Sequence, residues 1–425
     1  MTRGDLRAMM CCNTAPLAVP IFDFFERYTM KRTVYADHAA TAPLRPEALA
    51  AMLPFFSDEF ANPSSLHSPG ERAAKAVRAA RAEMAAALDC APGEVVFTSG
   101  GTESDNLALH SAAQAGRRAG RTHLIVSAVE HHAVLRAAEE LQRQGFSLSV
   151  LPVDGDGRVS VEALRAALRP DTALVSIMTA NNEIGTAQPI AALSRVCAAA
   201  GVPFHTDAVQ AVGHLPLSFA ALGCDYLSLS AHKFGGPKGV GALLVRKGAP
   251  FVPLLRGGAQ ERGRRAGTEN VPGILGMSKA LSCAAAEQEP ESKRLAGLGK
   301  KLCRGIAEIP RVKLNGGGER LPGIVSVCFE GIEGESLLLM LDNEGICASA
   351  GSACASGSLE PSHVLTAIGV PPQLALGALR LSLGALTTEA DIDRILQVLP
   401  PLVAHLREFS PLWAELCAGT KPHLA

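Results

Sequence analysis

The stretch "CDYLSLSAHKFGGPKGVGALLVRKG", from Cys224 to Gly248, places a lysine between two apolar runs. The runs 225–230 and 240–245 predict strands, and neither shows the polar–apolar alternation of a strand with one exposed face. Lys233 therefore stands at the edge of a sheet that we expect to be buried on both faces. A cation in that position needs a chemical reason.

Four more apolar runs of this kind lie upstream, over 123–129, 148–153, 172–179 and 202–208. Helical patterns between them cover 131–144, 160–169 after a capping Ser160, and 190–200 before Gly201. Strands alternating with helices predict an α/β fold with a mostly parallel sheet covered on both faces. Ligands of such sheets bind at the carboxyl ends of the strands.

The pattern changes after about residue 285, where a charged helical stretch leads to shorter strands at 323–329 and 346–349. We expect a large domain over 46–285 and a smaller α+β domain over 286–425. The segment 31–45 is expected to pack with the small domain. Residues 1–30 have no clear apolar region of a signal peptide, and they are interpreted as a disordered or spurious extension.

Composition excludes several classes of protein. The chain has 425 residues and a formal net charge of −1, with no long block of one sign, so no nucleic-acid surface is predicted. No apolar run approaches the roughly 20 residues that span a bilayer. Eleven cysteines without CxxC pairs argue against disulfides and zinc and favour a reducing compartment. The expected location is the cytoplasm.

An acid and a lysine follow successive predicted strands. Asp207 ends the strand "VPFHTDA", and Lys233 follows "DYLSLS". Because both lie at carboxyl ends of a parallel sheet, they face one crevice. A structural ion pair is the ordinary explanation for an acid and a lysine so placed, but the surrounding residues favour a ligand-binding site.

The surroundings supply groups for a phosphate and a ring. Gly101 and Thr102 in "FTSGGTESDNLALHSA" open a helix whose free N–H groups favour an anion. Ser230 and His232 flank the lysine and offer further donors, and His131 follows another strand end. Together they suit pyridoxal phosphate, whose aldehyde forms a Schiff base with a lysine and whose ring nitrogen pairs with an acid. Gln210 is placed to bond the cofactor O3′.

The sequence resembles the fold-type-I pyridoxal-phosphate cysteine desulfurases of the NifS/IscS kind. The matching stretches run in the family's order from about residue 34 to 394 and include "YADHAATAPLRPEAL", "NPSSLHSPGERA", "TSGGTESDNLAL", "EHHAVL", "NNEIGTAQPI", "HTDAVQAVG", "SAHKFGGPKGVGAL", "GGAQERGRRAGTEN", "SAGSACASGSLEPSHVL" and "LRLSLGALTTEADID". The resemblance implies a large domain with a mostly parallel seven-stranded sheet and a smaller α+β domain.

The resemblance also assigns roles. Lys233 becomes the Schiff-base lysine, Asp207 the partner of the pyridine nitrogen, and His131 the stacking and proton-transfer group. The remaining assignments are phosphate contacts by Gly101, Thr102, Ser230 and His232, ring contacts by Asn182 and Gln210, substrate binding by Asn182 and by Arg380 on its carboxylate, and a phosphate contact by Thr268 from the neighbouring subunit of a homodimer. Two positions depart from the usual pattern, because Gly101 replaces alanine and His38 replaces asparagine.

Cys354 distinguishes the desulfurases from other members of this fold. Small residues surround it in "SAGSACASGSLEPSH", which is typical of a mobile loop that exposes a thiol, whereas Cys347 is expected to be buried and inert. The resemblance implies that the Cys354 thiolate attacks the sulfur of L-cysteine, becomes a persulfide and passes sulfur to an acceptor protein. By the same resemblance, the acceptor is expected to be an iron–sulfur scaffold or a tRNA-thiolation enzyme. No resident metal is expected, and a transferred iron–sulfur cluster is the one metal group assigned to Cys354.

Three other functions share parts of this pattern. A selenocysteine lyase has the same scaffold and much of the same motif set, and only relative rates separate it from a desulfurase. A class V aminotransferase has no use for a cysteine such as Cys354. A partner that only binds other assembly proteins would not need Lys233, Asp207 and Arg380 together.

Overall fold

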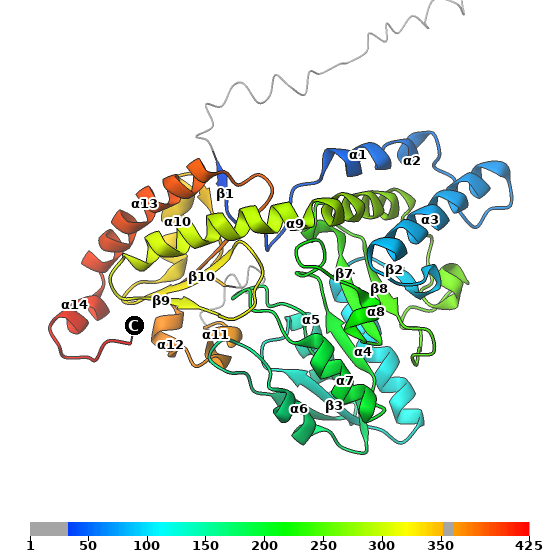
Figure 1. Cartoon of the computed structure of the whole chain (residues 1–425), viewed down its shortest axis with the longest axis horizontal. Helices are drawn as coiled ribbons and strands as arrows, with labels where there is room; N and C mark the ends of the chain where they lie inside the picture. The colour runs from blue at the N-terminus through cyan, green and yellow to red at the C-terminus, as the bar shows by residue number, and fades with distance from the viewer. Residues whose placement is uncertain (1–32, 352–360, 425) are drawn as a thin grey trace, which may run out of the picture. The chain divides into compact units, whose positions relative to one another are not determined.

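The computed structural model describes residues 33–351 and 361–424 (Figure 1). Residues 1–33 and 34–425 are separate units, and the helices and strands of the described residues lie in the second. The expected extension over residues 1–30 lies outside the described residues, and so does Cys354.

The large sheet has seven strands in the order β2-β8-β7-β6-β5-β3-β4. Their bounds are β2 (Val95–Thr98), β3 (His123–Ser127), β4 (Ser147–Leu151), β5 (Thr172–Ser176), β6 (Phe204–Asp207), β7 (Tyr226–Ser230) and β8 (Gly241–Val245). Neighbours from β4 to β7 are parallel, and β8 runs antiparallel to both β2 and β7. The six strands predicted from apolar runs are confirmed, and so is the fold class.

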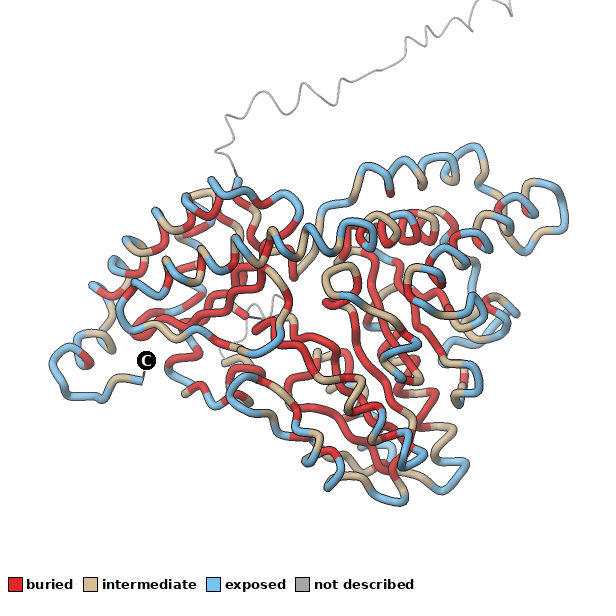
Figure 2. Tube along the Cα trace, in the orientation of Figure 1, coloured by how far each residue is buried: buried red, intermediate tan, exposed pale blue. Residues whose placement is uncertain are grey.

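Both faces of this sheet are buried, which explains why its strands show no alternation. Val96 packs in one cluster with Leu107 of α4, whereas its neighbours Val95 and Phe97 belong to a second cluster on the other face. Figure 2 shows the inner strands as buried segments inside helices whose outer faces are exposed, whereas the edge strand β4 is mostly half-buried. The helices around this sheet are α3 (Ser68–Ala87), α4 (Gly101–Arg118), α5 (His132–Arg143), α6 (Val161–Ala167), α7 (Ile190–Ala199) and α8 (Phe219–Leu222).

The predicted helices over 131–144, 160–169 and 190–200 correspond to α5, α6 and α7. The predicted cap of α6 is confirmed, because the Ser160 hydroxyl accepts hydrogen bonds from the N–H groups of Glu162 and Ala163. Such a cap satisfies donors that have no partner inside the helix.

A second core surrounds two small sheets. The antiparallel sheet has the order β12-β10-β9, and β1 lies parallel to β11. The strands are β1 (Val34–Tyr35), β9 (Val312–Asn315), β10 (Ile324–Phe329), β11 (Ile346–Cys347) and β12 (Ala378–Ser382), with helices α10 (Gly334–Asn343), α11 (His363–Ala367), α12 (Pro372–Ala375), α13 (Glu389–Glu408) and α14 (Pro411–Cys417). Val34 and Ala36 pack in this core with residues of the C-terminal third.

One long helix belongs to both cores. α9 (Val271–Ala307) buries Ile274 and Met277 against the large sheet, and Leu302 and Ile306 against the small ones (Figure 1). The expected domain boundary at 285–286 therefore falls inside a continuous helix. The short helices α1 (Pro46–Met52) and α2 (Pro54–Ser57) pack on α9. None of the helices in the described parts of the chain has the length and apolar character that a membrane span requires.

Candidate active site

The Lys233 amine lies at the carboxyl edge of the large sheet. β7 ends at Ser230, and one 3₁₀ turn, Ala231–Lys233, carries the lysine out of the strand. Its Nζ donates hydrogen bonds to the carbonyl oxygens of Ala39, at 2.6 Å, and Ala40, at 2.9 Å. The segment before α1 thus holds the amine in place.

Asp207 ends the neighbouring strand β6 and lies opposite Ser228 of β7. Its side chain is buried, and Oδ1 accepts a hydrogen bond from the N–H of Val209 at 2.8 Å. Burial raises the pKa of the Asp207 carboxyl, and the charges of His131 and Lys233 act in the opposite direction. The three predicted residues therefore lie close enough to interact electrostatically.

The predicted phosphate site brings a helix N-terminus next to a hydroxyl. α4 begins at Gly101 without a side-chain cap, so its first N–H groups and its dipole are directed at the space before it. A Cβ atom built on Gly100 would lie 3.7 Å from the Ser230 hydroxyl oxygen. The His232 Nδ1 lies 3.1 Å from Thr41 Oγ1, and burial together with the charge of Lys233 lowers the pKa of His232 to about 4.

The side chain of Val209 explains why position 101 is a glycine in this chain. A Cβ atom built there would come within 2.7 Å of Val209 Cγ2, closer than side chains approach one another. Alanine at Gly101 would favour the helix by less than about 1 kcal/mol, whereas overpacking costs about 1–3 kcal/mol. Gly101 and the bulky Val209 therefore fit as a pair.

Gln210 and His38 lie beside the lysine anchor. The Gln210 Nε2 donates to the Ala39 carbonyl at 2.9 Å, so that oxygen accepts from both Gln210 and Lys233. The predicted contact of Gln210 with a cofactor O3′ stays a prediction. The buried His38 ring packs edge-on against Tyr35 at 4.9 Å between centroids, and burial lowers the pKa of His38 to about 4.

Arg380 connects the small sheet to the large domain. Its side chain, on β12, is 1% exposed; Nη2 donates to Asp37 Oδ1 at 2.9 Å and Nη1 to the Asn182 carbonyl at 3.0 Å. Sequence reasoning missed Asp37, although it lies in the quoted motif "YADHAAT". A carboxylate at this position holds the guanidinium in one orientation.

Two buried acids near Asp207 also escaped sequence reasoning. Glu130 precedes His131, and its Oε1 accepts from the Met178 N–H at 2.9 Å; burial raises the pKa of Glu130 to about 8. The buried Asp105 of α4 lies 3.6 Å from His205 Nε2, and burial raises its pKa well above the ordinary range. Both acids lie inside quoted motifs, but nothing in the local sequence indicated that their side chains are buried.

Thr268 lies on an exposed loop that ends at α9. It lines a hollow of about 170 Å³ together with Ser99 of the same chain. Arg265 ties the loop to α4 through an ion pair with Glu103 at 2.8 Å.

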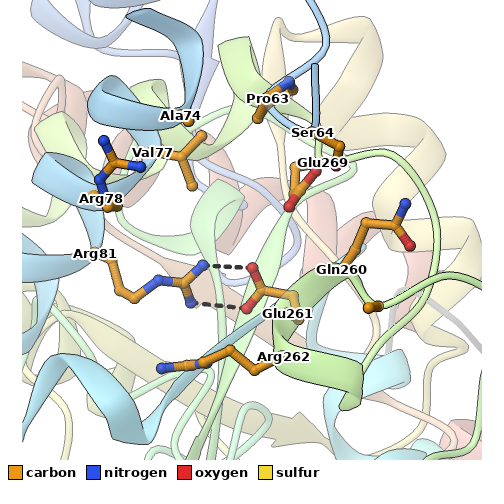
Figure 3. A pocket seen from close by; sticks show the side chains of 11 residues that line it. Pro63, Ser64, Ala74, Val77, Arg78, Arg81, Gln260, Glu261, Arg262 and Glu269 are labelled. Carbon is orange, nitrogen blue, oxygen red and sulfur yellow. Dashed lines mark hydrogen bonds and ion pairs between the residues drawn. The ribbon is translucent and has the colours of Figure 1, made fainter. Parts of the chain in front are cut away.

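A larger hollow of about 650 Å³ lies between the same loop and α3 (Figure 3). There the Arg81 guanidinium faces the Glu261 carboxylate with two hydrogen bonds, and Glu261 also accepts from the Phe97 N–H. None of the predicted cofactor or substrate residues lines this hollow. Its fixed ion pair braces the Thr268 loop against α3 and β2.

Comparisons with known proteins identify the family. The family model for class-V aminotransferases matches residues 34–395. The chain is 53% identical to the cysteine desulfurase IscS of Methanosarcina thermophila over 385 residues, 90% of this chain and 95% of that one. It is 51% identical to a cysteine desulfurase of Cereibacter sphaeroides over 386 residues, 90% of this chain and 98% of that one.

A solved NifS-like protein superposes with a TM-score of 0.83 at 38% identity, over 88% of this chain and 100% of that chain. The family match over residues 34–395 spans the large sheet and both small sheets. The chain belongs to the class-V aminotransferase family, among its cysteine desulfurases of the NifS/IscS kind.

Proposed function

We propose that this enzyme converts L-cysteine to L-alanine and transfers the sulfur to Cys354 and then to an acceptor protein. The observation that carries the proposal is the meeting of Lys233 and Asp207 at the ends of two adjacent strands, with His131 within electrostatic reach of the acid. Such a set of an amine, a buried acid and an imidazole serves proton movement on an amino acid.

The donor set fits pyridoxal phosphate. Lys233 offers the amine for the aldehyde, Asp207 the buried carboxyl for the ring nitrogen, and the start of α4 with Ser230 a cradle for the phosphate. When bound, this cofactor supplies an electron sink that lets a proton leave the α-carbon of an amino acid. Thr102, His232, Asn182 and Gln210 keep their predicted roles as further contacts.

The side chains divide the work on the substrate. Arg380, oriented by Asp37, binds the carboxylate of L-cysteine with its planar fork. Lys233 takes the proton from the α-carbon, and His131 assists proton transfer at the ring. Because Arg380 also bonds the Asn182 carbonyl, the carboxylate site and the ring-contact loop are held together.

The sulfur step requires the Cys354 thiolate. A bond forms between its sulfur and the substrate sulfur while the substrate Cβ–S bond breaks. The electron pair of the broken bond stays on the carbon fragment, which takes up protons and leaves as L-alanine. The acceptor is an iron–sulfur scaffold or a tRNA-thiolation enzyme, and a thiol reductant replaces it in the test tube. A cytoplasmic setting stays a prediction from cysteine content.

The direct test is product analysis with L-cysteine and dithiothreitol. We expect alanine and sulfide in equal amounts from a yellow protein. A yellow protein that is inert on L-cysteine but rapid on L-selenocysteine would replace the proposal with a selenocysteine lyase. A colourless protein without activity on either would favour a binding role.

The proposal includes a homodimer in which Thr268 reaches the phosphate site of the neighbouring subunit. Support comes from the exposure of Thr268 on a loop that two ion pairs brace, Arg265–Glu103 and Arg81–Glu261. A loop held this firmly can present one side chain to a second copy at little entropic cost.

Mixing two inactive variants tests the shared site. Thr268→Asp places a negative charge next to a phosphate, and Lys233→Ala removes the amine. In a heterodimer, one site would receive Lys233 and Thr268 from different chains, so a refolded equimolar mixture is expected to recover roughly a quarter of wild-type activity. Activity no higher than that of the separate variants would show that Thr268 serves its own chain.

A further inference from the structure

Strand β12 carries a second residue that faces the substrate site, two positions after Arg380. Arg380 and Ser382 both lie on β12, and each is 1% exposed. Because side chains alternate along a strand, the two side chains lie on the same face, with their α-carbons roughly 6.5 Å apart. Arg380 is assigned to the substrate carboxylate, whereas Ser382 has no part in the mechanism above, although it lies in the same motif, "LRLSLG".

Ser382 binds the segment 36–40 through its backbone and through its side chain. The Ser382 N–H donates to the Ala36 carbonyl at 2.7 Å, and the Ser382 carbonyl accepts from the His38 N–H at 3.1 Å. The Ser382 hydroxyl oxygen accepts from the Ala39 N–H at 2.9 Å, in a buried hydrogen bond. The segment therefore lies alongside β12, and the hydroxyl fixes it at Ala39.

Ala39 is also the residue at which this segment meets the lysine. Its carbonyl oxygen accepts from Lys233 Nζ at 2.6 Å and from Gln210 Nε2 at 2.9 Å. The next carbonyl, that of Ala40, accepts from the same Nζ at 2.9 Å. The Ser382 hydroxyl and the Lys233 amine thus bind the N–H and the carbonyl of one residue.

The two carbonyl oxygens determine the direction of the Lys233 amine. A neutral amine has two hydrogens, and when both point to carbonyl oxygens its lone pair points along a direction that these oxygens fix. The same oxygens stabilise the ammonium group that forms when the amine takes the proton from the α-carbon, because hydrogen bonds from a charged donor are stronger than neutral ones. The positions of the Ala39 and Ala40 carbonyls therefore affect both the approach of the base and the charge that it acquires.

We propose that Ser382 is a positioning residue for proton transfer, because it holds the Ala39–Ala40 carbonyls on which the Lys233 amine lies. Since Arg380 precedes it by two residues, β12 sets the position of the substrate carboxylate relative to the base that acts on the α-carbon. A displacement of about 1 Å between such groups can cost on the order of 10²-fold in rate. The inference rests on the proposed function, in which Lys233 removes the α-proton.

Exchange of the α-proton of L-alanine in D₂O isolates this step, because it requires Lys233 and Arg380 but no transfer of sulfur. Ser382→Ala removes the acceptor of the Ala39 N–H and is expected to slow deuterium incorporation, measured by NMR, about 10- to 100-fold. The dissociation constant of L-alanine, measured from the change in the visible spectrum, is expected to stay within about threefold of wild type, because Arg380 keeps its partners. α-Deuterated L-cysteine is expected to show a larger isotope effect on turnover in Ser382→Ala than in wild type.

Amide hydrogen exchange of the same holoenzymes gives a readout that does not depend on turnover. Peptides that contain Ala39 are expected to exchange faster in Ser382→Ala, because this N–H loses its buried acceptor, while peptides from the large sheet stay unchanged. Ser382→Thr keeps a hydroxyl and is expected to restore slow amide exchange and most of the α-proton exchange. Ser111→Ala is the matched control, since it removes a buried hydroxyl that donates to the Val252 carbonyl at 2.9 Å, and it is expected to change neither measurement.

Three results would overturn the inference. Wild-type amide exchange around Ala39 in Ser382→Ala would show that the hydroxyl does not hold the segment. Faster amide exchange together with α-proton exchange at the wild-type rate would show that the segment does not position Lys233. Weaker binding of L-alanine that accounts for the whole slowing would place the effect at Arg380. A wild-type enzyme that forms no alanine from L-cysteine would instead reject the proposed function itself.

Discussion

Lys233→Ala is expected to lower the conversion of L-cysteine at least about 1,000-fold. The Nζ is the amine held at the sheet edge by the carbonyls of Ala39 and Ala40, and removing a general base from such a position costs on the order of 10²–10⁴-fold. The loss of the bond that holds the cofactor adds to this. Alanine formation measured over hours, with the visible spectrum recorded in parallel, gives the result.

The structure offers a control lysine for this experiment. Lys247 is exposed in the turn after β8, and its backbone N–H donates to Glu94. Lys247→Ala is expected to retain wild-type turnover and spectrum. If Lys233→Ala kept more than a tenth of the activity, the assignment of Lys233 would be wrong even with a correct fold.

Cys354→Ala is expected to abolish sulfide release, by at least about 100-fold, while cofactor binding remains. A methyl group in place of the thiol leaves no nucleophile for the substrate sulfur. The residues that hold the cofactor lie on other elements, so the yellow colour and the first absorbance change with L-cysteine should persist. Sulfide release with dithiothreitol and the spectrum of the same sample are the two measurements.

Cys347 is the matched control for this second prediction. It lies seven residues upstream in β11, half-buried and paired with Tyr35, and desolvation raises the pKa of its thiol. Cys347→Ala should therefore keep most of the sulfide release. If Cys347→Ala abolished sulfide release and Cys354→Ala did not, the sulfur carrier would be Cys347 and the assignment of Cys354 would be wrong.

Local sequence predicted the large sheet well, because a strand buried on both faces appears in the sequence as a continuous apolar run. The runs 172–179 and 225–230 became β5 and β7 with ends that differ by at most three residues. The two-residue strands β1 and β11 are too short to produce such a pattern, and their pairing joins Val34 to Ile346 across most of the chain. Local periodicity carries no information on a contact of that kind.

In the candidate site, too, residues with a local sequence signal were found and residues defined by long-range contacts were missed. Lys233 and Asp207 were found because each directly follows a strand. Asp37 was not assigned, although it lies in a quoted motif, because its importance comes from a long-range partner, Arg380. An acid in a loop is ordinary until its partner is known.

The pairing of β1 with β11 also has a consequence for synthesis on the ribosome. Val34 leaves the ribosome early, but its partner Ile346 is made 312 residues later. At about 5–20 residues per second, β1 waits roughly 15–60 s with an unsatisfied edge. The last strand of the large sheet, β8, ends about 100 residues before Ile346. During the last part of this interval the nascent chain therefore has every strand of the large sheet but an unpaired β1, which a chaperone that binds exposed strand edges would protect.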